Sequence, residues 1–156
     1  HDLAIHRRSE MLLYMAARSQ LVEEIIRPAL EARKTVVCDR YLLANVVYQG
    51  YGGGLDVEML WEVGRVAAGD LMPDLTIVLD LPAGEAAARI RRQLDRMEQQ
   101  GIDFHERVRQ GFLAEAARRP DRIVVVDARG SIDQVAAETR AAVEAAIKRS
   151  SLACRQ

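Results

Sequence analysis

The sequence has no excess charge of either sign and no long apolar run, and each absence excludes a class of protein. Among 156 residues, 22 Lys and Arg stand against 23 Asp and Glu, a formal net charge of -1. This balance gives no general reason to expect nucleic acid or a membrane surface as a partner, so any cationic site must be local. No apolar run approaches the roughly 20 residues of a membrane span, and no signal peptide is visible.

Cysteine is scarce. Cys38 and Cys154 have neither metal-ligand spacing nor the pattern of a disulfide framework, so we expect a reduced, cytoplasmic protein. Hydrophobic residues make up 49% and charged residues 29%, as in soluble globular proteins. Without repeats or a low-complexity linker, the sequence predicts one domain over residues 1–148, followed by a tail at 149–156.

The first long pattern predicts a helix from Arg7 to about Arg33 that is buried on one stripe. Its apolar residues recur at intervals of three and four: Met11, Tyr14, Met15, Leu21, Val22, Ile25, Ile26 and Leu30. Pro28 is expected to kink this helix or to mark a break near its end. The glycine-rich stretch Gly50–Gly54 predicts a flexible loop.

Capping signals predict the later helices. The expected starts are at Asp56, at Pro82, and at two pairs with capping-box spacing, Asp103 with Glu106 and Ser131 with Gln134. The expected ends are near Ala68, where Gly69 follows, and near Lys148.

Three short apolar runs, at Thr35–Cys38, Leu75–Asp80 and Ile123–Asp127, predict strands. Because they alternate with helices, we expect an α/β fold with a parallel sheet joined by right-handed crossovers. Three strands are few for this architecture. That shortage, and a start at His1 that leads almost directly into a helix, suggest a missing preceding segment.

Asp39 and Arg40 follow the first predicted strand, at the sheet edge where ligands bind in parallel α/β folds. The planar fork of an arginine matches a phosphate, and an adjacent carboxylate can hold a metal through its waters. Asn45 and Tyr48 add an amide and an aromatic wall. The alternative is an ion pair between Asp39 and Arg40 that only closes the sheet edge.

Tyr14 and Arg18 lie four residues apart and project from one face of the first helix. An arginine on a buried stripe needs a partner, so spacing alone favours a structural salt bridge, for example to Asp39. The functional alternative is an aromatic platform with a fork of donors, suited to stacking a base and binding its edge.

Five motifs in order resemble thymidylate kinases. They are Tyr14–Arg18, Asp39–Tyr41, Asn45–Gly50, Pro73–Leu75 and Leu94–Glu98, and the similarity extends to about Ile147. The resemblance implies a P-loop NTPase-like nucleoside monophosphate kinase fold, a parallel sheet with flanking helices. It also implies that ATP and dTMP are the substrates, with Mg²⁺ as cofactor, and that the enzyme is a homodimer.

The resemblance also implies roles for the acceptor site. Tyr14 would stack on thymine, Arg18 would bind a thymine carbonyl, and Asn45 would reach the base. Arg40 would bind the acceptor phosphate.

Further roles follow for the neighbours of those residues. Asp39 would lie beside the phosphate and Mg²⁺, Tyr48 would exclude a 2′-hydroxyl, and Gln49 would be a weaker contact. Ala44 replaces a serine that is common in the family, which puts one polar contact in doubt.

Two segments match the donor side of the family. The charged stretch at about residues 85–102 would be the lid, in which Arg89, Arg92 and Arg96 share one helical face and would neutralise the transferring phosphoryl group. The alternative for these arginines is a solvated helix surface. Asp127, Ala128 and Arg129 match the loop that borders the adenine of ATP.

The sequence contains no Gly-x-x-x-x-Gly-Lys-Ser/Thr loop, which holds the donor phosphates in this fold. In the family this loop follows a strand that lies between the strands expected at Thr35 and Leu75. We therefore expect a carboxyl-terminal portion of a thymidylate kinase, inactive by itself, from an enzyme that converts dTMP to dTDP. A related deoxynucleotide or deoxynucleoside kinase and a non-catalytic nucleotide-binding remnant are the alternatives.

Overall fold

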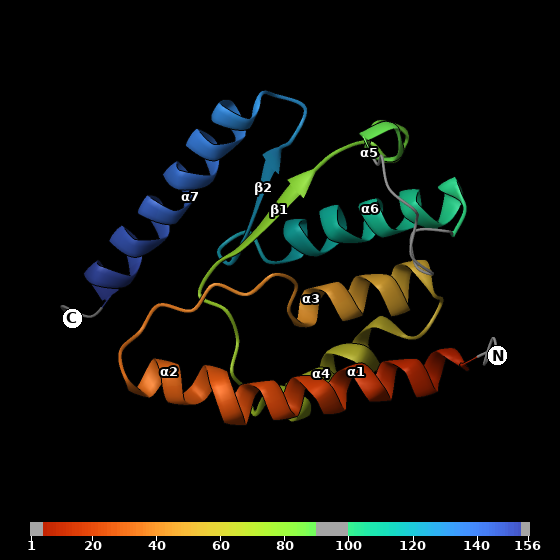
Figure 1. Ribbon diagram of the computed structural model, residues 1–156, viewed down its shortest axis with the longest axis horizontal. Helices are drawn as coiled ribbons and strands as arrows, with labels where there is room; N and C mark the ends of the chain where they lie inside the picture. Colours follow the sequence, from red (N-terminus) through yellow and green to blue (C-terminus); the bar gives the residue numbers. More distant parts are fainter. Residues whose placement is uncertain (1–4, 90–99, 154–156) are drawn as a thin grey trace. The chain divides into compact units, whose positions relative to one another are not determined.

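The structure, a computed structural model, describes residues 5–89 and 100–153, with side chains described to residue 149. The chain divides into two compact units. Unit 1 is His1–Met72 and unit 2 is Pro73–Gln156. Figure 1 shows the helices of unit 1 and the strand pair with its helices in unit 2.

Unit 1 begins with one continuous run of helix. It consists of α1 (Arg7–Leu21), the π-helical η1 (Val22–Ile26) and α2 (Arg27–Glu31). Pro28 lies at the start of α2, directly after the π-helical turn, and has no N–H to donate to the preceding turn of this continuous helix. The predicted helix is confirmed, and the break expected at Pro28 takes the form of a widened π segment just before it.

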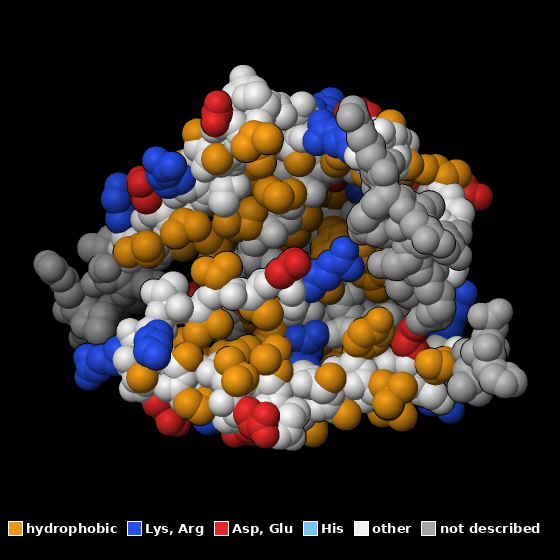
Figure 2. All heavy atoms as spheres, in the orientation of Figure 1, with side chains coloured by type: hydrophobic (Ala, Val, Ile, Leu, Met, Phe, Trp, Pro, Cys, Tyr) orange, Lys and Arg blue, Asp and Glu red, His pale blue; other side chains and the backbone are white. Residues whose placement is uncertain are grey.

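The buried stripe of this helix is narrower than predicted. Four of the expected residues are buried: Met11, Met15, Val22 and Ile26. The other four keep between 38% and 59% of their surface exposed: Leu21, Leu30, Tyr14 and Ile25. Figure 2 shows hydrophobic side chains gathered on the outer surface of this helix.

The second half of unit 1 holds α3 (Leu42–Asn45), which continues as the π-helical η2 (Val46–Gly52), and then α4 (Val57–Ala68). The predicted flexible loop at Gly50–Gly54 is wrong for its first three residues, which lie in η2. Gly50 is buried, and a β-carbon there would come within 3.0 Å of Leu60 and 3.1 Å of Val57. Packing against α4 therefore holds this part of the glycine run in helix.

Local signals predicted α4 well. The carboxylate of Asp56 accepts a hydrogen bond from the Met59 backbone N–H at 2.7 Å, as an N-cap does. Gly69 ends the helix with φ of 54°, the left-handed conformation that favours glycine. Both expected ends of this helix are confirmed.

The predicted strand at Thr35–Cys38 is wrong. These residues lie in an irregular segment between α2 and α3, and Val37 is 94% exposed. A β-branched run becomes a strand only when a neighbouring strand offers hydrogen-bond partners. In the described part of the chain, no strand pairs with this run.

Unit 2 is built on two parallel strands, β1 (Thr76–Asp80) and β2 (Ile123–Asp127). Their register pairs Thr76 with Ile123 and Asp80 with Asp127, so both strands end at the same edge. The helices of this unit are α5 (Ala83–Arg89), α6 (Ile102–Arg118) and α7 (Ile132–Ala153). Figure 1 shows α6 and α7 flanking the strand pair. Two of the three predicted strands and the parallel α/β arrangement are thus confirmed.

One of the two predicted capping boxes forms. The Ser131 backbone N–H donates to Gln134 Oε1 at 2.8 Å, and the Gln134 N–H donates to Ser131 Oγ at 3.3 Å. The box at Asp103 is wrong because α6 begins earlier, with Gly101 at its N-cap, and Asp103 lies inside its first turn. The last helix extends past the expected end at Lys148 to Ala153.

Each unit has its own apolar core. The buried residues of unit 1 include Leu42, Val46, Val47, Leu60, Trp61 and Ala68, and those of unit 2 include Val78, Phe104, Val108, Ile123 and Val126. Within the described residues, no helix has the length and apolar character needed to cross a membrane.

Candidate functional site

The α3–η2 helix carries three of the predicted site residues on successive turns. Asn45 and Gln49 are buried, at 6% and 3% exposure, whereas Tyr48 is half-buried. Asn45 Nδ2 donates a hydrogen bond to Gln49 Oε1 at 3.3 Å. The amide of Asn45 is therefore held by the next turn of its own helix.

Arg18 reaches this helix from α1. One Nη nitrogen donates to Asn45 Oδ1, and the guanidinium carbon lies 4.5 Å from the centroid of the Tyr41 ring. Burial lowers the pKa of Arg18 from its ordinary value, while the neighbouring Tyr41 and Cys38 act in the opposite direction. The salt bridge to Asp39 that spacing favoured is wrong, because the partners of Arg18 are a neutral amide and an aromatic ring.

Tyr14 lies one turn before Arg18 on α1 and is 43% exposed. Its ring was expected on the buried stripe, but helix geometry turns it toward the surface. The stacking role of Tyr14 therefore remains a prediction.

Asp39 and Arg40 lie together in the exposed segment before α3. The guanidinium carbon of Arg40 is 5.2 Å from the centroid of the Tyr48 ring. Its backbone has φ of 64°, a left-handed conformation that is uncommon for a non-glycine residue and occurs at functional sites. No ion pair between the two side chains appears among the described residues, so the alternative of a simple edge-closing pair gains no support.

Asp39 fits a magnesium ion by its chemistry. It is exposed, and Mg²⁺ is commonly held by one or two carboxylates together with waters and substrate phosphates. Within residues 5–89 and 100–153, no group of three or more His, Cys, Asp or Glu side chains could form a metal cage. A magnesium ion held by Asp39 would therefore depend on a bound nucleotide.

Tyr41 is a site residue that the sequence reasoning did not assign. It belongs to the quoted Asp39–Tyr41 motif, yet nothing local indicated that its ring would lie under Arg18. Its hydroxyl donates to the Leu71 backbone carbonyl at 3.0 Å, and burial raises its pKa above the ordinary value of 10.0. Arg7 donates a hydrogen bond to the Gly53 carbonyl just after η2.

The two predicted site arginines of unit 1, Arg18 and Arg40, have different surroundings. Arg18 is half-buried beside a neutral amide, which suits hydrogen bonds to the uncharged edge of a ring. Arg40 is exposed, lies beside the ring of Tyr48 and follows Asp39 in the chain. These surroundings suit an anion that has a metal ion near it. Asn45 and Tyr48, one helical turn apart, link these two environments.

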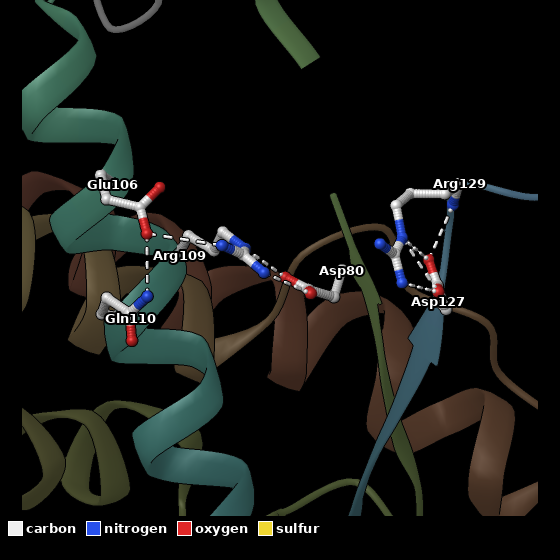
Figure 3. Close-up of polar contacts among 6 residues, drawn as sticks. All are labelled: Asp80, Glu106, Arg109, Gln110, Asp127 and Arg129. Atoms are coloured by element: carbon white, nitrogen blue, oxygen red, sulfur yellow. Dashed lines mark hydrogen bonds and ion pairs between the residues drawn. The ribbon is translucent and has the colours of Figure 1, made fainter. Parts of the chain in front are cut away.

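In unit 2, the described part of the predicted donor side forms contacts of its own. Arg89, at the end of α5, donates to the Ala128 carbonyl at 3.1 Å. Arg129 donates to both carboxylate oxygens of Asp127, which lowers the pKa of Asp127 to about 2 (Figure 3). Arg92 and Arg96 lie outside the described residues.

Comparison with known proteins identifies the family. The family model for thymidylate kinase matches residues 2–139. Thymidylate kinases of Rhodopirellula baltica and Deinococcus radiodurans are 48% and 49% identical to the chain over 143 and 136 residues. These alignments cover 92% and 86% of the chain, but 58% and 66% of the relatives.

A solved structure agrees with this assignment. The thymidylate kinase of Ehrlichia chaffeensis superposes with a TM-score of 0.68 at 29% identity, covering 85% of this chain and 63% of that one. The predicted P-loop NTPase-like α/β fold is thus confirmed. The chain therefore belongs to the thymidylate kinase family, because the family model matches residues 2–139 and a relative is 48% identical to the chain.

Proposed function

We propose that this chain supplies the dTMP-binding part of an enzyme that transfers the γ-phosphoryl group of ATP to dTMP, giving dTDP. The observation that carries the proposal is the arrangement on the α3–η2 helix. Asn45 binds Arg18 on one turn, and Tyr48 lies beside Arg40 on the next. A nucleoside monophosphate has the same order of parts: a neutral base edge, a sugar and a phosphate.

The base would lie at the Arg18 end of the site. The fork of Arg18 can donate to a thymine carbonyl, and the exposed ring of Tyr14 can stack on the base. Asn45 has further hydrogen-bonding capacity after its bond to Arg18, since an amide oxygen has two lone pairs. These three residues account for recognition of an uncharged, flat ligand.

The sugar and phosphate would lie at the Arg40 end. Arg40 would bind the phosphate through charge-assisted hydrogen bonds, and Tyr48, directly beside it, would leave no room for a 2′-hydroxyl. Asp39 would hold Mg²⁺, which supplies charge neutralisation for the phosphates when it is bound. Asp39 and Arg40 would thus align the acceptor oxygen and limit repulsion between the two nucleotides.

The lid and the 127–129 loop would serve ATP. Arg89, Arg92 and Arg96 would neutralise the transferring phosphoryl group, and Asp127, Ala128 and Arg129 would border the adenine. Such transfer depends on positioning and electrostatic stabilisation, without a covalent enzyme intermediate. Because the sequence contains no P-loop motif, we expect this chain alone to bind dTMP without turning over ATP.

Calorimetric titration of the chain with dTMP and with thymidine tests the acceptor site. We expect dTMP to bind at least about tenfold more tightly than thymidine, because only dTMP offers a phosphate to Arg40. Arg40→Ala should remove this preference. Arg65→Ala, which removes an exposed arginine of α4 in the same unit, is the matched control and should retain it.

Equal affinities for dTMP and thymidine would contradict the proposal and favour a deoxynucleoside kinase. ADP formation from dTMP and ATP tests the catalytic part separately. Turnover near that of a complete thymidylate kinase would show that the chain needs no P-loop motif.

The proposed assembly is a homodimer that pairs through the first helix, in a cytoplasmic setting. This helix exposes several large apolar side chains, namely Leu12 at 52%, Leu13 at 62% and Ile25 at 59%. Exposed apolar surface of this kind is typical of protein–protein contacts. Sedimentation velocity should show a dimer that Leu13→Lys weakens. A monomer at all concentrations would contradict this assembly.

A further inference from the structure

Arg18 is held in an unusual way for a half-buried arginine. Its Nε atom is buried and has no hydrogen-bond partner among the described residues. The side chain makes its hydrogen bond with the neutral Asn45 and lies over the ring of Tyr41. Since a long, charged side chain has many accessible rotamers, these two neighbours must fix its direction.

Tyr41 is itself firmly placed. Its hydroxyl donates to the Leu71 carbonyl at 3.0 Å, 30 residues away in the sequence, and its backbone is the N-cap of α3. The ring is therefore fixed at both ends. A cation held 4.5 Å from the centroid of such a ring is in the range of a favourable cation–π contact.

Gln49 fixes the other neighbour. Asn45 has its oxygen directed to Arg18 and its nitrogen directed to Gln49 Oε1. An amide with both ends in use has one orientation, because a flip would place donor against donor and acceptor against acceptor. Gln49 is only 3% exposed, so it is better placed to act through Asn45 than to touch a nucleotide.

We propose that Tyr41 and Gln49 are positioning residues for base recognition. Tyr41 holds the guanidinium of Arg18 in place, and Gln49 sets the amide of Asn45, so that a fixed pattern of donors and acceptors faces the base. This inference rests on the proposed function, and it assigns the choice between bases to two residues that act without contacting the ligand.

The test compares dTMP with dCMP, which share sugar and phosphate but differ at the base edge, where dCMP carries an amine in place of a carbonyl. Calorimetry on the full chain gives the ratio of the two affinities. We expect Tyr41→Leu to lower this ratio about tenfold, mainly through weaker dTMP binding. Tyr41→Phe keeps the ring and should retain most of the ratio.

Gln49→Met is the second variant, because it is close in size and removes the acceptor for Asn45. We expect it also to lower the ratio of dTMP to dCMP affinity, so the proposal stays testable if Tyr41→Leu does not fold. Circular dichroism identifies the folded variants.

The outcomes separate the inference from the function it rests on. If both folded variants weaken dTMP and dCMP equally, or leave both unchanged, the positioning role is wrong. If the unaltered chain binds dTMP no better than thymidine, the proposed function itself fails.

Discussion

Arg109 of α6 binds both carboxylate oxygens of Asp80 at the end of β1, with Nε at 2.7 Å and Nη2 at 2.9 Å (Figure 3). Asp80 is the register partner of Asp127, so two carboxylates end the parallel strands at one edge. Each has its own arginine, since Arg129 binds Asp127. The like charges at this edge of unit 2 are thereby compensated separately.

Replacing Arg109 should destabilise unit 2. Arg109→Ala leaves Asp80, whose side chain is 20% exposed, beside Asp127 without its cation, and we expect a loss of about 1–3 kcal/mol in the free energy of unfolding. Arg109→Lys should lose less, because a lysine retains the charge but cannot make two parallel bonds. Urea denaturation measures both.

Arg122→Ala is the matched control for Arg109→Ala, since it removes an exposed arginine next to β2. A loss in Arg122→Ala equal to that in Arg109→Ala would show that overall charge matters and not the pair with Asp80.

Acid should weaken unit 2 through both carboxylates. The hydrogen bonds from Arg109 lower the pKa of Asp80, and those from Arg129 lower the pKa of Asp127 to about 2. A carboxyl group whose pKa is lowered by folding stabilises the folded state at pH values above its unfolded-state pKa of 3.8. This stabilisation is lost as the pH falls toward the folded-state pKa. For Asp127 this window runs from about pH 4 to about pH 2.

Thermal unfolding followed by circular dichroism between pH 5 and pH 2 checks this prediction. The melting temperature should fall less steeply in Asp127→Asn and in Arg129→Ala than in the unaltered chain, because each variant removes one half of the pair. An unchanged slope in both variants would contradict a role for this pair.

The sequence correctly predicted those helix ends that are determined by residues close to them in the chain. The cap at Asp56 and the left-handed stop at Gly69 are decided within a few residues of each helix end. The runs that became β1 and β2 are apolar and β-branched, and they pair with each other. Thr35–Cys38 is also an apolar, β-branched run, but no strand of the described residues lies beside it, so the pattern alone could not decide its structure.

The site shows the same division. The Asn45–Gln49 contact has helical i, i+4 spacing, and sequence could suggest it. The contacts of Arg18 with Asn45 and of Tyr41 with Leu71 join residues 27 and 30 positions apart. Such contacts depend on how the helices pack, which is why the sequence alone favoured a salt bridge for Arg18, for example to Asp39, and gave Tyr41 no role.

Removing the cap of α4 should destabilise unit 1. In Asp56→Ala the Met59 N–H loses its acceptor at 2.7 Å, and we expect a loss of about 1 kcal/mol in unfolding free energy. Asp56→Asn keeps an oxygen at the cap and should lose much less. Equal losses in the two variants, measured by urea denaturation, would contradict the capping role.

Gly64 allows α4 to pack closely on α3, and adding a methyl group there should disturb the acceptor site. A β-carbon at Gly64 would lie 2.8 Å from Leu42 Cδ2 and closer still to Cδ1, and Leu42 is fully buried. We expect Gly64→Ala to lose about 1–3 kcal/mol in stability. Because α3 also carries Asn45, it should weaken dTMP binding as well.

Two further variants establish that the cause is this contact. Gly84→Ala in α5 has no atom within 4 Å of the added carbon, so it should be neutral or gain up to about 1 kcal/mol from better helix propensity. Leu42→Ala leaves a cavity by itself, but that cavity can accept the new methyl group of Gly64→Ala. The double variant should therefore be more stable than the sum of the two single losses predicts, and strict additivity in urea denaturation would contradict direct contact between these positions.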